Sequence, residues 1–199
     1  FMSKRREQNI LKIIGDVKCK SILDVGCAEG DFGYLLQKNG ARVEGVDISK
    51  TAVKKANKKL TSAVVVDLNL QKLAFSTNSY DIVIFSEVIE HLQKPQNVLK
   101  EIHRVLNKTG FLIITTPNFM YWGNRIKFLK GEFKYEKIGM FDETHIHFYT
   151  YKTLLDDLRN SGFKIAQKNH IYLSNKFQFI TKKFPAIFAY QFLLKCIKK

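Results

Sequence analysis

The chain alternates between short apolar runs and longer stretches with apolar residues at helical spacing. The short runs have the length of buried β-strands, and the longer stretches have the period of amphipathic helices. Strands and helices that alternate in this way predict an α/β fold with a mainly parallel, doubly wound sheet and helices on both faces. The predicted strands are SILDVG (21–26), RVEGVD (42–47), SAVVVD (62–67), YDIVIFSEV (80–88) and FLIITTP (111–117).

Four helices are expected around these strands. The first covers residues 3–17, and the second ends at Asn39–Gly40, a favourable C-cap pair. Ser49 is expected to cap the third helix. Pro95 is expected to begin the fourth helix, which Gly110 closes.

The pattern changes after the fifth strand. Residues 118–149 are aromatic and irregular, and a long connection of this kind is usually a lid or a substrate wall. A helix is predicted over residues 151–162, and strand signals return in 163–173 and 190–197, which makes seven strands. We interpret the 199 residues as a single domain, 1–199, with an insertion at about 118–149.

Composition narrows the class of protein. Cys19, Cys27 and Cys196 form neither a CxxC pair nor a zinc spacing, which favours a reducing, cytoplasmic location. No signal peptide and no apolar run of membrane-spanning length is seen, so we expect no transmembrane segment. The net charge of +15 comes mainly from scattered lysines, and we expect most of them to form a solvated basic surface. The alternative is attraction to an anionic partner, such as nucleic acid, a phosphorylated substrate or an acidic membrane surface, and the charge alone does not choose among these.

The first predicted strand runs into a glycine-containing turn that carries the main functional signal. Gly26 and Gly30 lack a Cβ, so the backbone can approach a ligand closely there. Asp47 ends the second strand about 20 residues further on, where the ribose of a nucleoside lies in a doubly wound fold. The sequence therefore predicts a site for a nucleoside cofactor.

Five landmarks in order resemble the class I S-adenosylmethionine-dependent methyltransferases. This resemblance covers nearly the whole chain and implies a Rossmann-like fold and S-adenosylmethionine as cofactor. The landmarks are DVGCAEG (24–30), VDIS (46–49), VVDL (65–68), FSEVIEH (85–91) and TTP (115–117).

The resemblance also implies which residues hold each part of the cofactor. The first loop would pass under the methionine part, with Asp24, Gly26, Cys27 and Gly30. The end of the second strand would hold the ribose, with Asp47 and Ile48, and the end of the third would meet the adenine, with Asp67 and Leu68. Ser86 and Glu87, after the fourth strand, would lie at the methyl-donor end.

The loop departs from the family pattern at one position. Ala28 stands where the family usually has the middle glycine of GxGxG, and we expect a small change of loop shape.

Two alternatives to an S-adenosylmethionine-dependent enzyme remain, a dinucleotide-binding protein and an inactive protein. A dinucleotide would need GxGxxG, which the spacing of Gly26, Gly30 and Gly33 does not provide. The other alternative is a catalytically inactive protein that retains the cofactor fold, against which the intact acids Asp24, Asp47 and Asp67 argue.

The run EVIEH supplies a candidate metal site. Glu87, Glu90 and His91 would share one face if the segment is helical, and with His145 they could bind Mg or Mn. This set resembles the ubiquinone-type O-methyltransferases and the small-RNA 2′-O-methyltransferases. The alternative is that the EH pair only lines the pocket.

A hydroxyl nucleophile needs a base, and histidine titrates near neutral pH. We therefore predict His145 as the catalytic base, with His147 second.

The acceptor is expected to be a small molecule or a glycan, methylated on oxygen. The aromatic insertion would form a wall for an apolar or sugar-bearing acceptor, and the segment FDETHIHFYT is similar to that of methyltransferases acting on such substrates. The alternative acceptor is RNA, methylated at a 2′-oxygen with the help of a metal. Residues 171–187, which mix Phe, Ile and Lys, could contact an anionic membrane surface or simply pack at the sheet edge.

Overall fold

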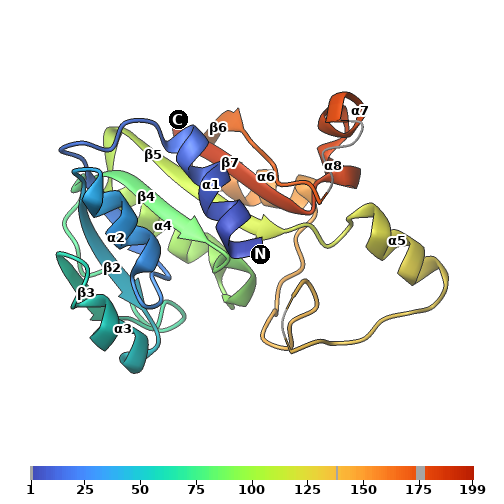
Figure 1. Cartoon of the computed structure of the whole chain (residues 1–199), viewed down its shortest axis with the longest axis horizontal. Coiled ribbons are helices and arrows are strands. Elements are labelled where there is room, and N and C mark those ends of the chain that lie inside the picture. Colours follow the sequence, from blue (N-terminus) through green and yellow to red (C-terminus); the bar gives the residue numbers. More distant parts are fainter. Residues whose placement is uncertain (1, 138, 174–177) are drawn as a thin grey trace.

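A computed structural model describes residues 2–137, 139–173 and 178–199. Its centre is a seven-stranded sheet in the order β3-β2-β1-β4-β5-β7-β6 (Figure 1). Strands β1 to β5 are parallel to one another, and β7 is antiparallel to both of its neighbours. The predicted fold class is therefore confirmed. The strands are β1 (Ser21–Val25), β2 (Arg42–Asp47), β3 (Ser62–Val65), β4 (Tyr80–Ser86), β5 (Leu106–Pro117), β6 (Phe163–Lys168) and β7 (Gln191–Lys198).

Helices cover both faces of the sheet (Figure 1). One face packs against α1 (Met2–Ile14), α2 (Asp31–Lys38) and α3 (Lys50–Ala56). The other face packs against α4 (Pro95–Val105) and α6 (Tyr151–Asn160). The remaining elements are α5 (Trp122–Leu129), α7 (Gln178–Lys183), α8 (Pro185–Phe188) and the short 3-10 turn η1 (Ile89–His91).

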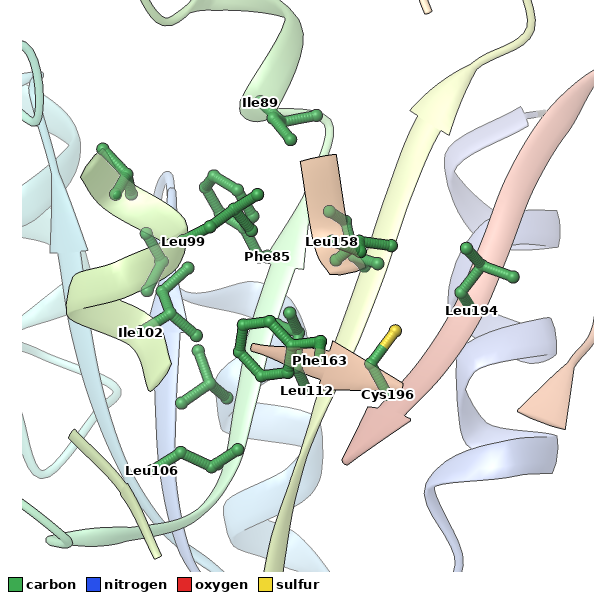
Figure 2. Close-up of a cluster of buried hydrophobic side chains, with 14 of the residues drawn as sticks. Phe85, Ile89, Leu99, Ile102, Leu106, Leu112, Leu158, Phe163, Leu194 and Cys196 are labelled. Carbon is green, nitrogen blue, oxygen red and sulfur yellow. The ribbon is translucent and has the colours of Figure 1, made fainter. Parts of the chain in front are cut away.

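Alternation along the strands divides the core into two layers, because successive side chains of a strand point to opposite faces. In β4, Ile82 and Ile84 join the layer under α1, α2 and α3, whereas Val83 and Phe85 join the layer under α4 and α6. Figure 2 shows the second layer, in which Phe85 lies among the side chains contributed by α4 and α6. Burial of each such side chain contributes about 1.5–3 kcal/mol.

The structure corrects the predicted end of the fourth helix. Helix α4 ends at Val105, not at Gly110, because Leu106 already pairs with Tyr80 of β4. Gly110 has a different role: a Cβ there would lie 2.7 Å from the carbonyl oxygen of Asp81. Glycine at this position therefore allows β5 to approach β4.

The aromatic insertion, predicted to be irregular, includes helix α5. Figure 1 shows α5 and the loop after it extending beyond the end of the sheet. Phe119 contacts the rings of Phe128, Phe141 and Phe148, so the insertion has a small aromatic core of its own. Helices α7 and α8 also form in a segment for which no helix was predicted.

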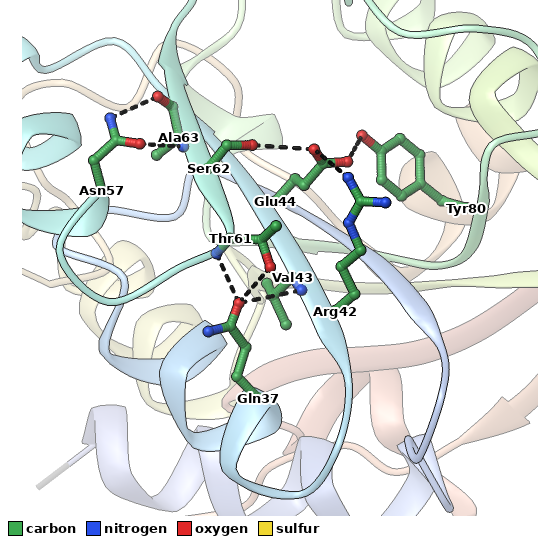
Figure 3. A network of polar contacts seen from close by, with 9 residues as sticks. All are labelled: Gln37, Arg42, Val43, Glu44, Asn57, Thr61, Ser62, Ala63 and Tyr80. Carbon is green, nitrogen blue, oxygen red and sulfur yellow. Dashed lines mark hydrogen bonds and ion pairs between the residues drawn. The ribbon is translucent and has the colours of Figure 1, made fainter.

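Polar contacts fix the two strands that end in the predicted cofactor acids. The Gln37 side-chain oxygen accepts hydrogen bonds from the backbone N–H groups of Val43 and Thr61, which lie on β2 and just before β3. Glu44 of β2 accepts from the hydroxyl groups of Ser62 and Tyr80. Figure 3 shows this network, which holds β3 at the edge of the sheet against β2.

Within residues 2–137, 139–173 and 178–199, we find no helix that is both long and apolar enough to cross a membrane.

Candidate functional site

The loop at residues 26–30 adopts a conformation that depends on glycine. Gly26 has φ +83, and a Cβ there would lie only 2.3 Å from Cγ2 of Val88. Ala28 also has a positive φ, of 47. The close contact between Gly26 and Val88 brings the loop against the segment that follows β4.

Asp47, at the end of β2, fixes the other side of this loop. One carboxylate oxygen accepts from the N–H of Ala28 at 2.9 Å, and the other accepts from the N–H of Ser49 at 2.9 Å. Ser49 in turn caps α3 through the N–H of Ala52, as predicted. The strand end, the loop and the next helix are thus joined through one carboxylate.

A cavity of about 340 Å³ opens beside this carboxylate. It brings together side chains from the ends of β2, β3 and β4, because the carboxyl ends of parallel strands meet at one edge of the sheet. Its lining is Gly26, Ala28, Asp47, Ile48, Val66, Asp67, Leu68, Asn69, Glu87, Val88, His91 and Leu92.

A second cavity, of about 230 Å³, shares Gly26 and Ala28 with the first. Asp24, Cys27 and Ser86 line it. Burial of the Asp24 side chain raises its pKa to about 7, and the nearby charge of Asp47 adds to this effect. Asp24 therefore carries a poorly solvated carboxyl group that a cationic ligand would stabilise in its charged form.

Glu87, directly after β4, lies where several elements meet. It has φ 56, an unusual conformation for a residue with a side chain, which costs about 1–3 kcal/mol. Its carboxylate accepts from the Thr115 hydroxyl at 2.8 Å and from the Gln191 amide at 2.6 Å, and the Arg6 guanidinium lies 3.5 Å away. Burial raises the pKa of Glu87, although Arg6 opposes this shift.

A third cavity, of about 350 Å³, lies on the other side of Glu87. Glu87 and His91 line both this cavity and the 340 Å³ cavity, and Arg6 lines both this one and the cavity at Asp24. His145 also lines the third cavity. The first and third cavities therefore meet at Glu87, and the cavity at Asp24 adjoins the first at Gly26 and the third at Arg6.

Glu90, His91 and His145 form a compact group at this junction. One potential ligand atom from each lies within 4.8 Å of the others. Glu90 is 2% exposed; one of its oxygens accepts from the Thr116 hydroxyl at 3.0 Å, and the other has no hydrogen-bond partner among the residues described.

The hydrogen bonds of the two histidines fix their tautomers. Nδ1 of His91 donates to the Thr144 carbonyl at 3.1 Å, and Nδ1 of His145 donates to the Met140 carbonyl at 3.1 Å. Each neutral ring therefore keeps an unprotonated Nε2, which can accept a proton or bind a metal. Burial lowers the pKa of His145, which favours its neutral form.

Comparison with known proteins identifies the family. A family profile described as a methyltransferase domain matches residues 1–168. The chain belongs to the methyltransferase-domain family. The predicted resemblance to S-adenosylmethionine-dependent methyltransferases is thereby confirmed.

Individual relatives agree with this family. A ubiquinone biosynthesis O-methyltransferase of Nitrosomonas europaea is 32% identical over 112 residues, which are 54% of this chain and 48% of that protein. A malonyl-[acyl-carrier protein] O-methyltransferase of Hamiltonella defensa is 29% identical over 107 residues, 54% of this chain and 42% of that protein. The chain thus spans less than half the length of these curated relatives. The crystal structure of a SAM-dependent methyltransferase from Archaeoglobus fulgidus shares the fold, with a TM-score of 0.69, 20% identity and coverage of 98% and 94% of the two chains.

Most predicted cofactor residues of this methyltransferase domain line the two cavities beside the loop. Gly30 does not: it is the N-cap of α2, with φ 78, and packs against Ala56 and Leu60. Cys27 lines the cavity at Asp24 mainly as packing, since a Cβ on Gly45 would lie 2.6 Å from its sulfur.

Not all of the predicted metal ligands and bases lie together in the structure. Glu87 is not part of the compact group of possible metal ligands among the described residues, because its carboxylate is held by Thr115 and Gln191. His147 directs Nε2 to the Gln93 carbonyl at 3.4 Å and does not line the third cavity, whereas His145 does.

Three residues at the site were not predicted from the sequence: Arg6, Thr115 and Gln191. Arg6 comes from α1, Thr115 from β5 and Gln191 from β7, and all three contact Glu87. The TTP run could have indicated Thr115, because it ends a strand of the same parallel sheet. The only local signal for Arg6 was its place on an amphipathic helix.

Two glycines with similar backbone angles test the close packing of the loop. Gly15→Ala places a side chain at φ +79 with nothing within 4 Å, so we expect a loss of about 1–2 kcal/mol in the free energy of unfolding. Gly26→Ala should lose about 1–3 kcal/mol more, because its Cβ overlaps Val88. Urea denaturation measures both. Equal losses would mean that Val88 does not constrain the loop.

The raised pKa of Asp24 predicts a pH-dependent cost to stability. Because its pKa is about 7 in the folded protein against an ordinary 3.8, the folded state binds the proton more tightly. The stability that this proton provides is present below about pH 4 and is lost as the pH rises to about 7.

Asp24→Asn mimics the protonated form and should therefore gain stability over the parent protein between pH 4 and 7. Urea denaturation of both cofactor-free proteins across this range measures the difference. A difference that stays constant with pH would contradict the assignment.

Proposed function

We propose that this chain transfers the methyl group of S-adenosylmethionine to an oxygen of a small-molecule or glycan-type acceptor. The observation that carries this proposal is a set of three adjoining cavities, two of which meet at Glu87. Two of them hold the acids predicted for the cofactor, Asp24, Asp47 and Asp67, and the third holds His145.

The cavities fit the chemistry of the cofactor. Asp47 and Asp67 offer carboxylate oxygens where the ribose and the adenine would lie, and Ile48 and Leu68 offer apolar surface beside them. Asp24 and Glu87 provide negative charge for a cofactor that carries a positive sulfonium and an ammonium group. When bound, S-adenosylmethionine supplies an already activated methyl group, so positioning of the two reactants can account for much of the rate.

His145 is the favoured base for removing the proton of the acceptor hydroxyl. Its Nε2 has no proton when the ring is neutral, its Nδ1 is held by the Met140 carbonyl, and its lowered pKa keeps it neutral near pH 7. His147 remains the second choice, and its Nε2–H already faces the Gln93 carbonyl.

The acceptor class rests on the aromatic insertion and on the relatives. Trp122, Ile126 and Leu129 are exposed along one side of α5, and Phe133 and Tyr135 are exposed after it, which provides apolar and ring surface for a sugar or an apolar molecule. The two named relatives are both O-methyltransferases.

A metal-assisted RNA 2′-O-methyltransferase is the second candidate. Glu90, His91 and His145 fit a divalent cation such as Mg or Mn: a buried carboxylate oxygen lacks a partner, and two imidazoles keep Nε2 unprotonated. In this case the metal would be held by these three residues, with Glu87 beside them. The net charge of +15 favours an RNA acceptor.

The predicted peripheral membrane contact of residues 171–187 stays a prediction. Phe179 and Phe184 are exposed beside Lys182 and Lys183, as such a contact requires, and residues 174–177 lie outside the described residues.

Calorimetric titration with S-adenosylhomocysteine tests the cofactor and the metal together. We expect saturable binding that Asp47→Ala weakens by about tenfold or more, since this change removes the carboxylate that orders the loop. Titration with Mn in a separate experiment, with a chelator as control, should show binding that Glu90→Gln abolishes if the RNA-type site exists. Absence of S-adenosylhomocysteine binding in the parent protein would support the inactive alternative and overturn the proposal.

Turnover distinguishes the two histidines. S-adenosylhomocysteine formation is measured over a panel of catechols, monosaccharides and short RNA oligonucleotides to find an acceptor. On that acceptor, His145→Ala should lower kcat by about a hundredfold or more, while His147→Ala should retain most activity. Wild-type turnover in His145→Ala would exclude it as the base.

A further inference from the structure

A separate cavity of about 430 Å³ is lined by residues of α6, β6, α7 and α8 and of the segment after β6. None of its lining residues lines the three cavities of the methyltransferase site. Lys168, Lys182 and Lys183 line it, and no carboxylate does so among the residues described. The cavity is therefore strongly positive, in contrast with the acid-lined cofactor site.

His170 gives this cavity a buried hydrogen-bond donor. The backbone N–H of Leu193 donates to Nδ1 of His170 at 3.2 Å, so Nδ1 is the acceptor and the proton of the neutral ring is on Nε2. The side chain is 92% buried, and Nε2 has no hydrogen-bond partner within the described chain. Burial, with the nearby charge of Lys168, lowers the pKa of His170 to about 4, so the ring is neutral at pH 7.

Tyr151 provides a second unsatisfied group beside His170. The two rings meet edge to face, with centroids 5.4 Å apart, and the Tyr151 hydroxyl also lacks a partner among the described residues. The Lys168 ammonium lies 5.4 Å from the centre of the Tyr151 ring. Two buried polar atoms without partners, next to several cations, are uncommon because each loses its hydration without compensation.

We propose that this cavity binds a phosphoryl group. The lysines would neutralise the charge of the phosphoryl group. The Tyr151 hydroxyl and His170 Nε2 have almost no exposed surface, so a small shift of the two rings would let the phosphoryl oxygens accept hydrogen bonds from them. A cavity of about 430 Å³ leaves room for the molecule to which the group is attached, either a soluble phosphorylated compound or a phospholipid headgroup. The proposal is independent of the methyl-transfer reaction.

Inorganic phosphate is the probe that tests the site. The whole chain, saturated with S-adenosylhomocysteine, is titrated with phosphate by calorimetry at constant ionic strength, with chloride as the control anion. We expect saturable binding that Tyr151→Phe weakens by about tenfold, because only the hydroxyl is removed. Thermal unfolding without phosphate should be unchanged in this variant, since the hydroxyl has no partner to lose.

A charge-matched pair of variants separates the cavity from general attraction to a basic surface. The triple change of Lys168, Lys182 and Lys183 to Ala should abolish phosphate binding. The same triple change of Lys50, Lys54 and Lys58, which are exposed on or after α3, should leave phosphate binding intact. Absence of saturable binding in the parent protein, or equal weakening by both triple changes, would overturn the proposal.

Vesicles identify the source of the phosphoryl group. The assay is sedimentation with phosphatidylcholine vesicles that contain phosphatidylglycerol. If the protein sediments with them, and replacement of Lys168, Lys182 and Lys183 but not of the α3 lysines abolishes this, the ligand is a phospholipid headgroup. Phosphate binding without such sedimentation assigns a soluble phosphorylated ligand.

Discussion

The half-buried carboxylate of Glu87 makes the contacts on which the geometry of this methyltransferase domain depends. Its hydrogen bonds and ion pair join β5, β7 and α1 to the end of β4, although these elements are far apart in the sequence. A residue with positive φ persists only where its surroundings hold it, and here Thr115, Gln191 and Arg6 do so. Because the cavity beside Asp47 and the cavity at His145 both include Glu87, the same contacts hold in place the side chain that the two cavities share.

The placement of the three acids at one edge of the sheet could be predicted because its signal lies in a few consecutive residues. Asp24, Asp47 and Asp67 each follow a short apolar run, and parallel strands bring their carboxyl ends to one edge of the sheet. Ser49 was recognised as a helix cap for the same reason: its effect depends on only three residues of sequence. A feature that depends on interactions among a few consecutive residues can be predicted from the sequence pattern.

The remaining features depend on contacts between distant segments. Arg6 and Gln191 are separated by nearly the whole chain, and only the antiparallel placement of β7 beside β5 brings Gln191 to Glu87. The predicted end of α4 was wrong for a related reason. Strand pairing of Leu106 with Tyr80 outweighs the helical period of that segment. Likewise, the tautomer of His170 depends on the backbone of Leu193 on another strand.

The distribution of charge explains how one basic protein can serve ligands of opposite sign. The net charge is +15, yet the side chains around the three central cavities include Asp24, Asp47, Asp67, Glu87 and Glu90. At physiological ionic strength exposed charges act over about 8 Å, so the field inside each cavity is set by its own lining and not by the net charge. Acidic lining suits the proposed sulfonium cofactor at Glu87, and basic lining suits the proposed phosphoryl group in the lysine-lined cavity beside α6.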